Sequence, residues 1–289
     1  MKLLVNLFDS EFDHSLEQDG FYTASWTVKP TLIEYIKNQP VWDGITLFTE
    51  RHLHRVKEVQ SDIKVAWLLE SPAIHPWSLD VVVSYEDDYD LILTTVPELL
   101  SRGSKYKRFS TGSCRIKKVN RNPFPIKDRL CSIIASNKTQ TEGHQLRHKI
   151  IQDCQGFDVW GSGYKRFENK EDALENYKFS VCVMNTKTDN FFTEVITDCF
   201  FVGTVPIFWG CPNIGEFFDE KGILSFNTVE ELQHILDNLN DDLYETLRPH
   251  IKNNFDMVQD YISTDDNVAK VLLENIQHDR IPSHHFLQR

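Results

Sequence analysis

The sequence predicts an α/β protein built from two successive units, each with a parallel sheet covered by helices. Short apolar runs typical of buried strands alternate with segments whose apolar residues recur every three or four positions, as in amphipathic helices. This alternation occurs twice, on either side of a basic stretch at residues 101–129. The length of 289 residues suits two domains of roughly 150 residues each. We therefore expect a cleft between two α/β units.

In the first unit, apolar runs predict strands and one segment predicts a helix. The chain opens with a strand at residues 3–8, and residues 29–37 are expected to be helical because apolar side chains stand at positions 32, 33 and 36. Four further apolar runs predict strands, at residues 43–49, 64–69, 79–85 and 90–94.

The stretch from residue 101 to residue 129 carries ten of the 31 Lys and Arg residues and a single acid, Asp128. Its Gly and Pro residues are typical of a connection between domains, so the boundary is expected between residues 122 and 123. Two interpretations stay open: a solvated loop, or one wall of a cleft that holds phosphate.

The second unit repeats the alternation with longer helices. Strands are expected at residues 130–135, 157–160, 179–184 and 205–209. Helices are expected at residues 141–154, 170–177, 193–201, 229–239, 241–251 and 267–277. The final residues contain His278, His284 and His285, and we expect a frayed polar tail there rather than a metal site.

Composition and charge exclude several classes of protein. A hydrophobic content of 40% is too high for a disordered chain, and a net charge of −12 argues against a general nucleic-acid binder. No apolar segment approaches the roughly 20 residues of a membrane span, and the apolar run at residues 3–8 is shorter than a secretion signal requires, so neither is expected. The six cysteines form no CxxC pair, so they are expected to be buried, reduced thiols: Cys114, Cys131, Cys154, Cys182, Cys199 and Cys211.

The most informative segment spans residues 177–210, YKFSVCVMNTKTDNFFTEVITDCFFVGTVPIFWG. A buried strand is expected to end at Asn185, and Thr193 is a suitable N-cap for the next helix, which Glu194 opens. The N-terminus of a helix can hold a phosphate, and a carboxylate there can accept hydrogen bonds from ribose hydroxyls. An ordinary strand–loop–helix unit with Glu194 as a capping acid is the alternative.

This segment resembles the donor-binding segment of the α-1,3/α-1,4-fucosyltransferases, glycosyltransferase family 10, whose pattern runs YKF, FEN, TEK and GT-[VI]-P. Three further segments are similar to the family and follow its order: ESPAIH at residues 70–75, SYEDDYD at residues 84–90, and Ser136-Asn137 followed by Arg147. The match covers residues 65–218. Four motifs in the order of the family carry the resemblance.

The resemblance implies a fold of the GT-B type, with two Rossmann-like domains and a cleft between them. Residues 1–122 would bind the acceptor, and residues 123–289 would bind the nucleotide sugar and end in closing helices. The implied activity is inverting, metal-independent transfer of fucose or a related sugar from a nucleotide-sugar donor, GDP-linked by resemblance, to a glycan hydroxyl. The donor is a substrate, and no cofactor, nucleic acid or membrane span is expected.

The resemblance also assigns site residues. Glu70 would be the base that deprotonates the acceptor, a role that fits a carboxylate where a buried strand ends. The donor would be bound by Ser136, Asn137, Arg147, Asn185, Lys187, Thr193 and Glu194. Arg147 would contact the diphosphate, as the forked geometry of arginine suits. His75 and Tyr85 would contact the acceptor. Asp88 and Asp90 match a metal-free family segment, so no metal ligand is assigned.

Three donor-segment residues depart from the family pattern. Met184 replaces the Glu of FEN, Phe191 replaces a Tyr, and Val195 replaces the Lys of TEK. The lost cation could be replaced by one or more of Lys187, Lys138, Lys117, Lys118 and Arg121. Glu86 also replaces an Arg of the SYR segment.

Because of these departures, a UDP-linked or other donor stays open, as does a non-catalytic binding relative of the family. The acceptor, the linkage and the oligomeric state cannot be read from the sequence. The lack of a membrane segment leads us to expect a cytoplasmic enzyme of a bacterial or viral setting.

Overall fold

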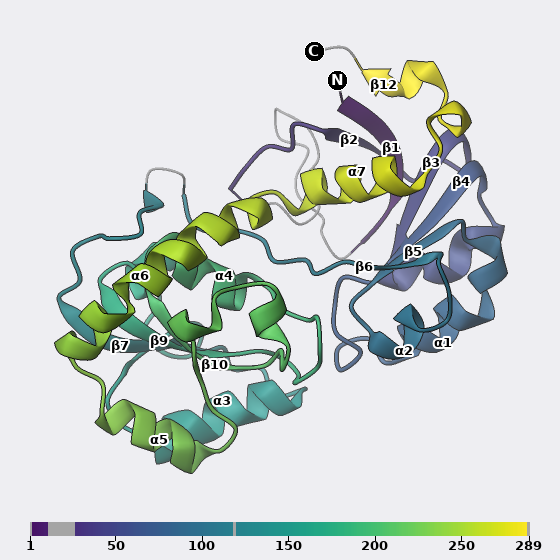
Figure 1. Cartoon of the computed structure of the whole chain (residues 1–289). Helices are drawn as coiled ribbons and strands as arrows, with labels where there is room; N and C mark the ends of the chain where they lie inside the picture. The colour runs from purple at the N-terminus through teal and green to yellow at the C-terminus, as the bar shows by residue number, and fades with distance from the viewer. Residues whose placement is uncertain (1, 11–26, 118–119, 288–289) are drawn as a thin grey trace. The chain divides into compact units, whose positions relative to one another are not determined.

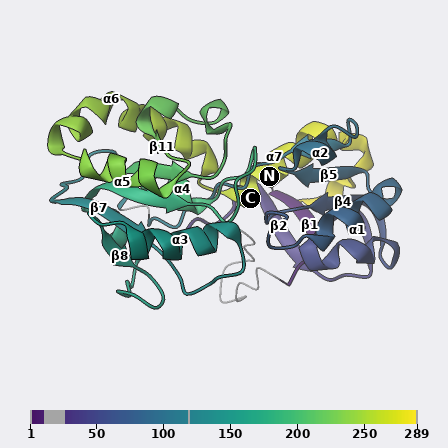
Figure 2. The same ribbon diagram turned by 90° about the horizontal axis from the view of Figure 1, so that it is seen from below.

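The computed structural model describes residues 2–10, 27–117 and 120–287 (Figure 1). The chain forms two compact units, one made of Met1–Thr111 with Ser263–Arg289 and the other of Gly112–Ile262. Each unit is an α/β structure with helices packed on its sheet (Figures 1 and 2). The predicted fold class is therefore confirmed. Lys118, one of the cations suggested as a replacement for the missing lysine, lies outside the described residues.

The first unit contains a seven-stranded sheet in the order β12-β1-β3-β4-β5-β6, with β2 also paired to β1. The parallel strands are β1 (Lys2–Phe8), β2 (Ile33–Lys37), β3 (Val41–Thr49), β4 (Gln60–Trp67), β5 (Leu91–Thr94) and β6 (Tyr106–Arg108). The short strand β12 (Phe286–Leu287) joins the edge of β1 in the antiparallel direction.

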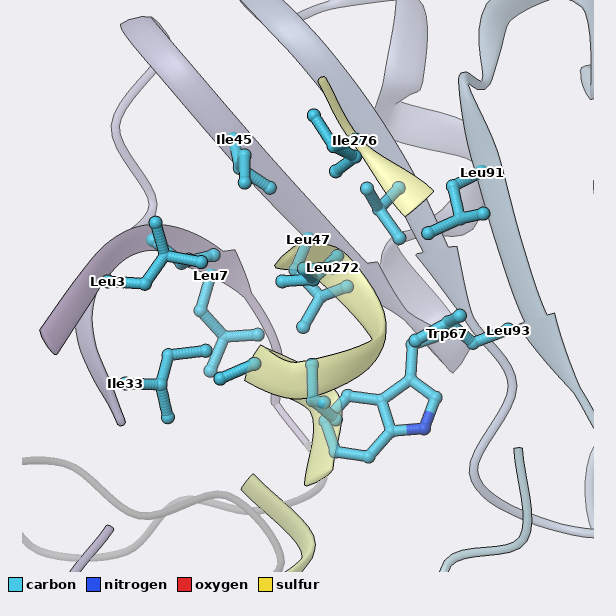
Figure 3. Packing of buried hydrophobic residues seen from close by; sticks show 14 of the residues in the cluster. Leu3, Leu7, Ile33, Ile45, Leu47, Trp67, Leu91, Leu93, Leu272 and Ile276 are labelled. Atoms are coloured by element: carbon cyan, nitrogen blue, oxygen red, sulfur yellow. The ribbon is translucent and has the colours of Figure 1, made fainter. Parts of the chain in front are cut away.

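Both faces of this sheet are covered. On one face, helix α7 (Thr264–Asn275) packs Leu272 against Leu47 and Trp67, in the cluster that Figure 3 shows. On the other face lie η1 (Glu50–Lys57), α1 (Trp77–Ser84) and α2 (Pro97–Leu100), which contribute buried side chains to a second core cluster. Alternate residues along each strand thus supply the two cores, as the twofold period of a strand requires.

Two sequence predictions in this unit are wrong. Residues 29–37 do not form a helix, because Ile33–Lys37 is strand β2 and pairs in register with β1. Residues 79–85 do not form a strand, because Trp77–Ser84 is helix α1. The valine run of α1 favours a strand locally, but burial of Val82 against η1 and the sheet overrides that preference.

The second unit contains a five-stranded parallel sheet in the order β11-β10-β9-β7-β8. Its strands are β7 (Arg129–Ile134), β8 (Asp158–Trp160), β9 (Tyr177–Val183), β10 (Val205–Trp209) and β11 (Leu224–Ser225). Helices α3 (Glu142–Asp153), α5 (Val229–Asp237) and α6 (Asp241–Met257) pack in one core cluster, and α4 (Glu194–Phe201) packs in another. The four strands predicted for this unit are confirmed to within about two residues.

The division between the units differs from the one expected at residues 122 and 123. It lies between Thr111 and Gly112, because the buried side chains of Cys114 and Ile116 pack into the core around α4. Residues 263–289 return to the first unit, since α7 packs on its sheet and β12 pairs with β1. The terminal residues up to 287 are consequently ordered rather than a frayed tail.

Two further expectations have structural outcomes. All six cysteines are buried, as predicted, and none of the six forms a disulfide bond. Among the described residues, no helix is long and apolar enough to cross a membrane.

Candidate functional site

Glu70 lies just beyond the carboxyl end of β4, as the sequence predicts, and its side chain is half-buried. The backbone there is held by Glu50, which opens η1 at the end of the neighbouring strand β3. One carboxylate oxygen of Glu50 accepts hydrogen bonds from the N–H groups of Leu69 (2.5 Å) and Glu70 (2.9 Å). Glu50 is fully buried, so its carboxylate fixes the backbone position of Glu70 from inside the unit.

Sequence reasoning missed Glu50. The signal was present, because Glu50 directly follows a buried strand, as Glu70 does, and adjacent parallel strands end at the same edge of a sheet.

The two expected acceptor contacts also lie in the first unit. The carbonyl of Ser71 accepts hydrogen bonds from the N–H groups of Ile74 (2.9 Å) and His75 (3.3 Å), so a tight turn separates Glu70 from His75. The buried ring of His75 lies against Trp77, with ring centroids 5.5 Å apart. Tyr85 follows α1, and the ammonium of Lys57 lies 5.3 Å from its ring centre.

The acidic segment after Tyr85 is engaged in ion pairs. Glu86 makes a forked contact with Arg102 (2.9 and 2.8 Å), which together with the Tyr106 hydroxyl lowers the pKa of Glu86 to about 2. Asp88 pairs with Lys57 (3.5 Å) and Asp90 pairs with Arg280 (2.8 Å). These acids therefore hold separate cations of the same unit.

In the second unit, Arg147 and Asn185 come together at the carboxyl end of β9. The guanidinium of Arg147 donates two hydrogen bonds to the carbonyl of Val183, one of them at 2.9 Å from Nε, and its Nη2 lies 3.4 Å from Asn185 Oδ1. The close packing of α3 against the end of β9 requires glycine at position 143, because a Cβ there would lie 1.7 Å from the Met184 carbonyl oxygen. Gly143 also donates its N–H to the Asn185 carbonyl (3.0 Å).

Glu194 lies in a cluster of four charged side chains at the start of α4. Its carboxylate is 3.3 Å from Arg115 Nη2 and 4.0 Å from Lys170 Nζ, while Lys170 also pairs with the fully buried Asp198 (2.6 Å). Thr193 is the N-cap, as predicted, and accepts a hydrogen bond from the N–H of Val195 (3.4 Å). We call Arg115, Lys170, Glu194 and Asp198 the α4 charge cluster.

Opposite charges in this cluster favour the charged forms of Glu194 and Lys170. Burial alone would raise the pKa of Glu194, but the positive charges of Arg115 and Lys170 outweigh it and hold the pKa below its ordinary value. Burial would lower the pKa of Lys170, but Asp198 and Glu194 outweigh it and raise the pKa. The cluster contains two basic and two acidic side chains, and Arg147 adds a further basic side chain beside it.

Arg147 is close enough to Glu194 to interact with it electrostatically. Burial lowers the pKa of Arg147, and the negative charge of Glu194 opposes that shift. Arg147, Asn185, Thr193 and Glu194 thus form one group at the strand ends of the second unit.

Of the other predicted donor residues, Ser136 is half-buried and two are exposed. Ser136 follows β7 and its hydroxyl accepts a weak hydrogen bond from the N–H of Lys138 (3.4 Å), and Asn137 is exposed. Lys187 is exposed and donates to Asn227 Oδ1 (2.6 Å), so its contact is with the loop before α5.

The departures from the family pattern have a structural explanation. Met184 and Phe191 are almost completely buried and belong to the core around α4, so they face other apolar side chains. Val195 packs against the same core. Arg115 and Lys170 pair with Glu194, the residue before Val195, and neither is among the replacements for the lysine that the sequence suggests. Arg115 belongs to the basic stretch at residues 101–129, whereas Lys117 instead donates to Asn169.

The chain is similar to known proteins in sequence and in fold. Residues 124–266 match the family profile described as glycosyltransferase family 10 (fucosyltransferase), C-terminal part. An α-(1,3)-fucosyltransferase of Helicobacter pylori, FucT, is 28% identical over 158 residues, which cover 50% of this chain and 32% of the relative. An α-(1,4)-fucosyltransferase of Arabidopsis thaliana is 22% identical over 202 residues, covering 64% of this chain and 49% of the relative.

The matched part of the chain thus spans between a third and a half of these curated relatives. Among solved structures, an α1,3-fucosyltransferase with GDP-fucose superposes with a TM-score of 0.52 at 15% identity, covering 96% of this chain and 91% of the other. A second α1,3-fucosyltransferase structure gives a TM-score of 0.50 at 16% identity, with 97% and 92% covered. These superpositions support a fold of the GT-B type.

Proposed function

The chain belongs to glycosyltransferase family 10, and from this premise we propose that it transfers a sugar from a nucleotide-sugar donor to a hydroxyl group of a glycan. The observation that supports the proposal best is the group formed by Arg147, Asn185 and Glu194 at the strand ends of the second unit. Ligands of open α/β sheets bind at such strand ends.

Each member of the group has a role that its chemistry suits. The guanidinium of the half-buried Arg147 is held by the Val183 carbonyl and offers its remaining N–H groups to the diphosphate. Asn185 supplies an amide to phosphate or ribose. Glu194 is ionised, so its carboxylate accepts hydrogen bonds from sugar or ribose hydroxyls.

Arg115 supplies the positive charge that Val195 no longer provides. Its side chain is 40% exposed and its Nη2 lies 3.3 Å from Glu194, so a ligand bound by Glu194 is within reach of the guanidinium. The developing charge on the departing diphosphate is then stabilised by Arg147 and Arg115, which is a metal-independent way to favour departure.

Glu70 is the proposed base. Inversion requires a carboxylate that removes the proton of the acceptor hydroxyl as its oxygen attacks the anomeric carbon, on the face opposite the leaving diphosphate. Glu50 positions this base through its two backbone hydrogen bonds. The acceptor sugar is bound by the aromatic side chains that follow Glu70 in the chain. Trp77 is 38% exposed and lies beside His75, and Tyr85 follows at the end of α1.

We expect a GDP-linked sugar, fucose or a relative of it, as the donor. Nucleotide binding can be tested by thermal unfolding of the whole chain with GDP, UDP, CDP and their sugars, because a ligand at about 100 times its Kd stabilises by about 2.7 kcal/mol. GDP and one GDP-sugar should raise the melting temperature by several degrees. Arg147→Ala should abolish that rise.

Arg248→Ala, on helix α6, is the matched control and should keep the full response to GDP. Equal stabilisation of Arg147→Ala and the native protein by GDP would remove Arg147 from the proposed donor site. A selective response to UDP instead of GDP would change the donor class and leave the transferase proposal standing.

The role of Glu50 predicts a kinetic effect that differs from simple destabilisation. Glu50→Gln keeps one acceptor oxygen but loses the charge, which should weaken two backbone hydrogen bonds and lower kcat by about ten- to a hundredfold. The KM for the donor should stay constant, because the donor residues lie in the other unit.

Steady-state kinetics should be run beside Glu58→Gln, a nearby exposed acid at the end of η1. A fall in melting temperature with native kcat would mean that Glu50 has only a structural role.

A non-catalytic binding protein is the second candidate, favoured by the burial of Met184 and Phe191 and by the loss of the lysine at Val195. Incubation with GDP-sugars and a mixture of glycan acceptors, followed by mass spectrometry, separates the two. Any turnover above a Glu70→Gln blank rejects the binding-only function, whereas donor binding without turnover supports it.

A further inference from the structure

The first unit contains a group of side chains that the proposed transfer reaction does not use. Asp43, His284 and His285 each offer one side-chain nitrogen or oxygen atom, and these three atoms all lie within 4.8 Å of one another. His285 Nε2 is 2.8 Å from one carboxylate oxygen of Asp43, and His284 Nε2 is 2.9 Å from the other. Two imidazoles thus converge on a single carboxylate.

The fold brings these residues together from distant parts of the chain. Asp43 lies in β3 where the pairing with β4 shifts register between Trp42 and Ile45, and such an irregularity changes the direction of a side chain. The histidines end η9 (Ser283–His285), directly before β12. Because β12 pairs with β1 and β1 pairs with β3, the group links the returning C-terminal segment to the sheet.

One ligand is held rigidly. His285 is 2% exposed, and its ring lies against Trp42 with centroids 4.5 Å apart. Gly44 makes room for it, because a Cβ at that position would lie 3.0 Å from His285 Cδ2. Its Nδ1 is buried and has no hydrogen-bond partner among the described residues, so the only polar contact of the ring is the one at Nε2.

The other two ligands are open to solvent. The side chains of Asp43 and His284 are 62% and 63% exposed, so an ion can enter and water can complete its coordination. Two imidazole nitrogens and one carboxylate oxygen are the donor set that zinc and its first-row neighbours accept, with water in the remaining position. Magnesium and calcium prefer all-oxygen ligands.

We propose that Asp43, His284 and His285 form a binding site for a divalent transition-metal ion of the zinc class. The bound ion joins η9 to β3 and so fastens the C-terminal segment to the first unit. Its role is structural, and the proposal is independent of the transfer reaction and of the donor site in the second unit.

The test uses the full chain after dialysis against EDTA and zinc chloride as the probe. Calorimetric titration should show one equivalent of zinc per chain, and zinc should raise the melting temperature. Asp43→Asn and His284→Ala change exposed side chains, and each should weaken zinc binding by at least about tenfold. His54→Ala removes an exposed histidine of the same unit and should bind zinc as the native chain does.

Cobalt(II) provides a spectroscopic control. Its absorption in the visible region should appear with the native chain and His54→Ala, and it should be lost in Asp43→Asn and His284→Ala. Equal zinc affinity in all four proteins would place the ion elsewhere and overturn the proposal. So would an absence of zinc and cobalt binding by the native chain, which would leave only a hydrogen-bonded Asp–His–His group.

Discussion

Replacing Glu70 with glutamine should lower the rate of sugar transfer by at least about a thousandfold while leaving nucleotide affinity within about twofold of the native value. A positioned general base contributes roughly 10²- to 10⁴-fold, and an amide cannot accept the proton of the acceptor hydroxyl. Nucleotide affinity should persist because Arg147, Asn185 and Glu194 belong to the other unit. The substitution replaces one carboxylate oxygen of a half-buried side chain by an amide nitrogen, so the fold should survive.

Three measurements check this expectation. Single-turnover kinetics with saturating donor reports the transfer step, and titration with GDP reports the donor site. The pH profile of kcat/KM should lose its acidic limb in Glu70→Gln, because that limb reports protonation of the base. The exposed acid Glu98 on α2 offers a matched control, and Glu98→Gln should behave as the native protein.

A rate for Glu70→Gln within about tenfold of the native one would show that another group removes the proton. Loss of GDP binding together with activity would instead show that the substitution acts on the donor site. The assignment of Glu70 as the base would be wrong in either case.

Replacing Lys170 with alanine should destabilise the second unit by about 3–5 kcal/mol. Lys170 Nζ lies 2.6 Å from Asp198, whose side chain is fully buried, so its removal leaves a buried carboxylate without its cation. The pKa of Asp198 is already raised by burial, with Lys170 opposing that shift, so the loss of Lys170 should raise it further. Asp198 would then be partly protonated, and the free energy of unfolding would fall.

Urea denaturation followed by tryptophan fluorescence measures this change, since Trp160 and Trp209 belong to the same unit. Lys149→Ala removes an exposed lysine of α3 and should have little effect. The double variant Lys170→Met with Asp198→Leu should recover much of the stability, because an apolar pair of similar volume can replace a buried ion pair. A stability of Lys170→Ala within about 1 kcal/mol of native would contradict the importance of this pair.

The second unit was the more predictable one from sequence. Its strands are continuous apolar runs, as expected for a sheet covered on both faces, and Thr193 was identified as an N-cap from its side chain and position. In the first unit, the local secondary-structure preferences of two short segments predicted the wrong elements. Residues 33–37 become a strand because β1 offers a partner, and the valine-rich segment of α1 becomes helical because of packing.

The candidate site was predictable only where a motif named its residues. Arg147 and Asn185 meet as expected, and Glu194 opens α4 as expected. Arg115 and Lys170 were missed because their relation to Glu194 is created by contacts between positions 79 and 24 apart in the chain. No local pattern encodes such contacts.

The return of residues 263–289 to the first unit has a consequence for synthesis on the ribosome. The second unit is one continuous segment, so it can fold as soon as residue 262 has left the exit tunnel. The first unit must wait for α7, because Leu272 and Ile276 complete its core beside Leu47 (Figure 3). Until then its sheet presents an uncovered apolar face. We therefore expect the nascent chain to need a chaperone most during this interval.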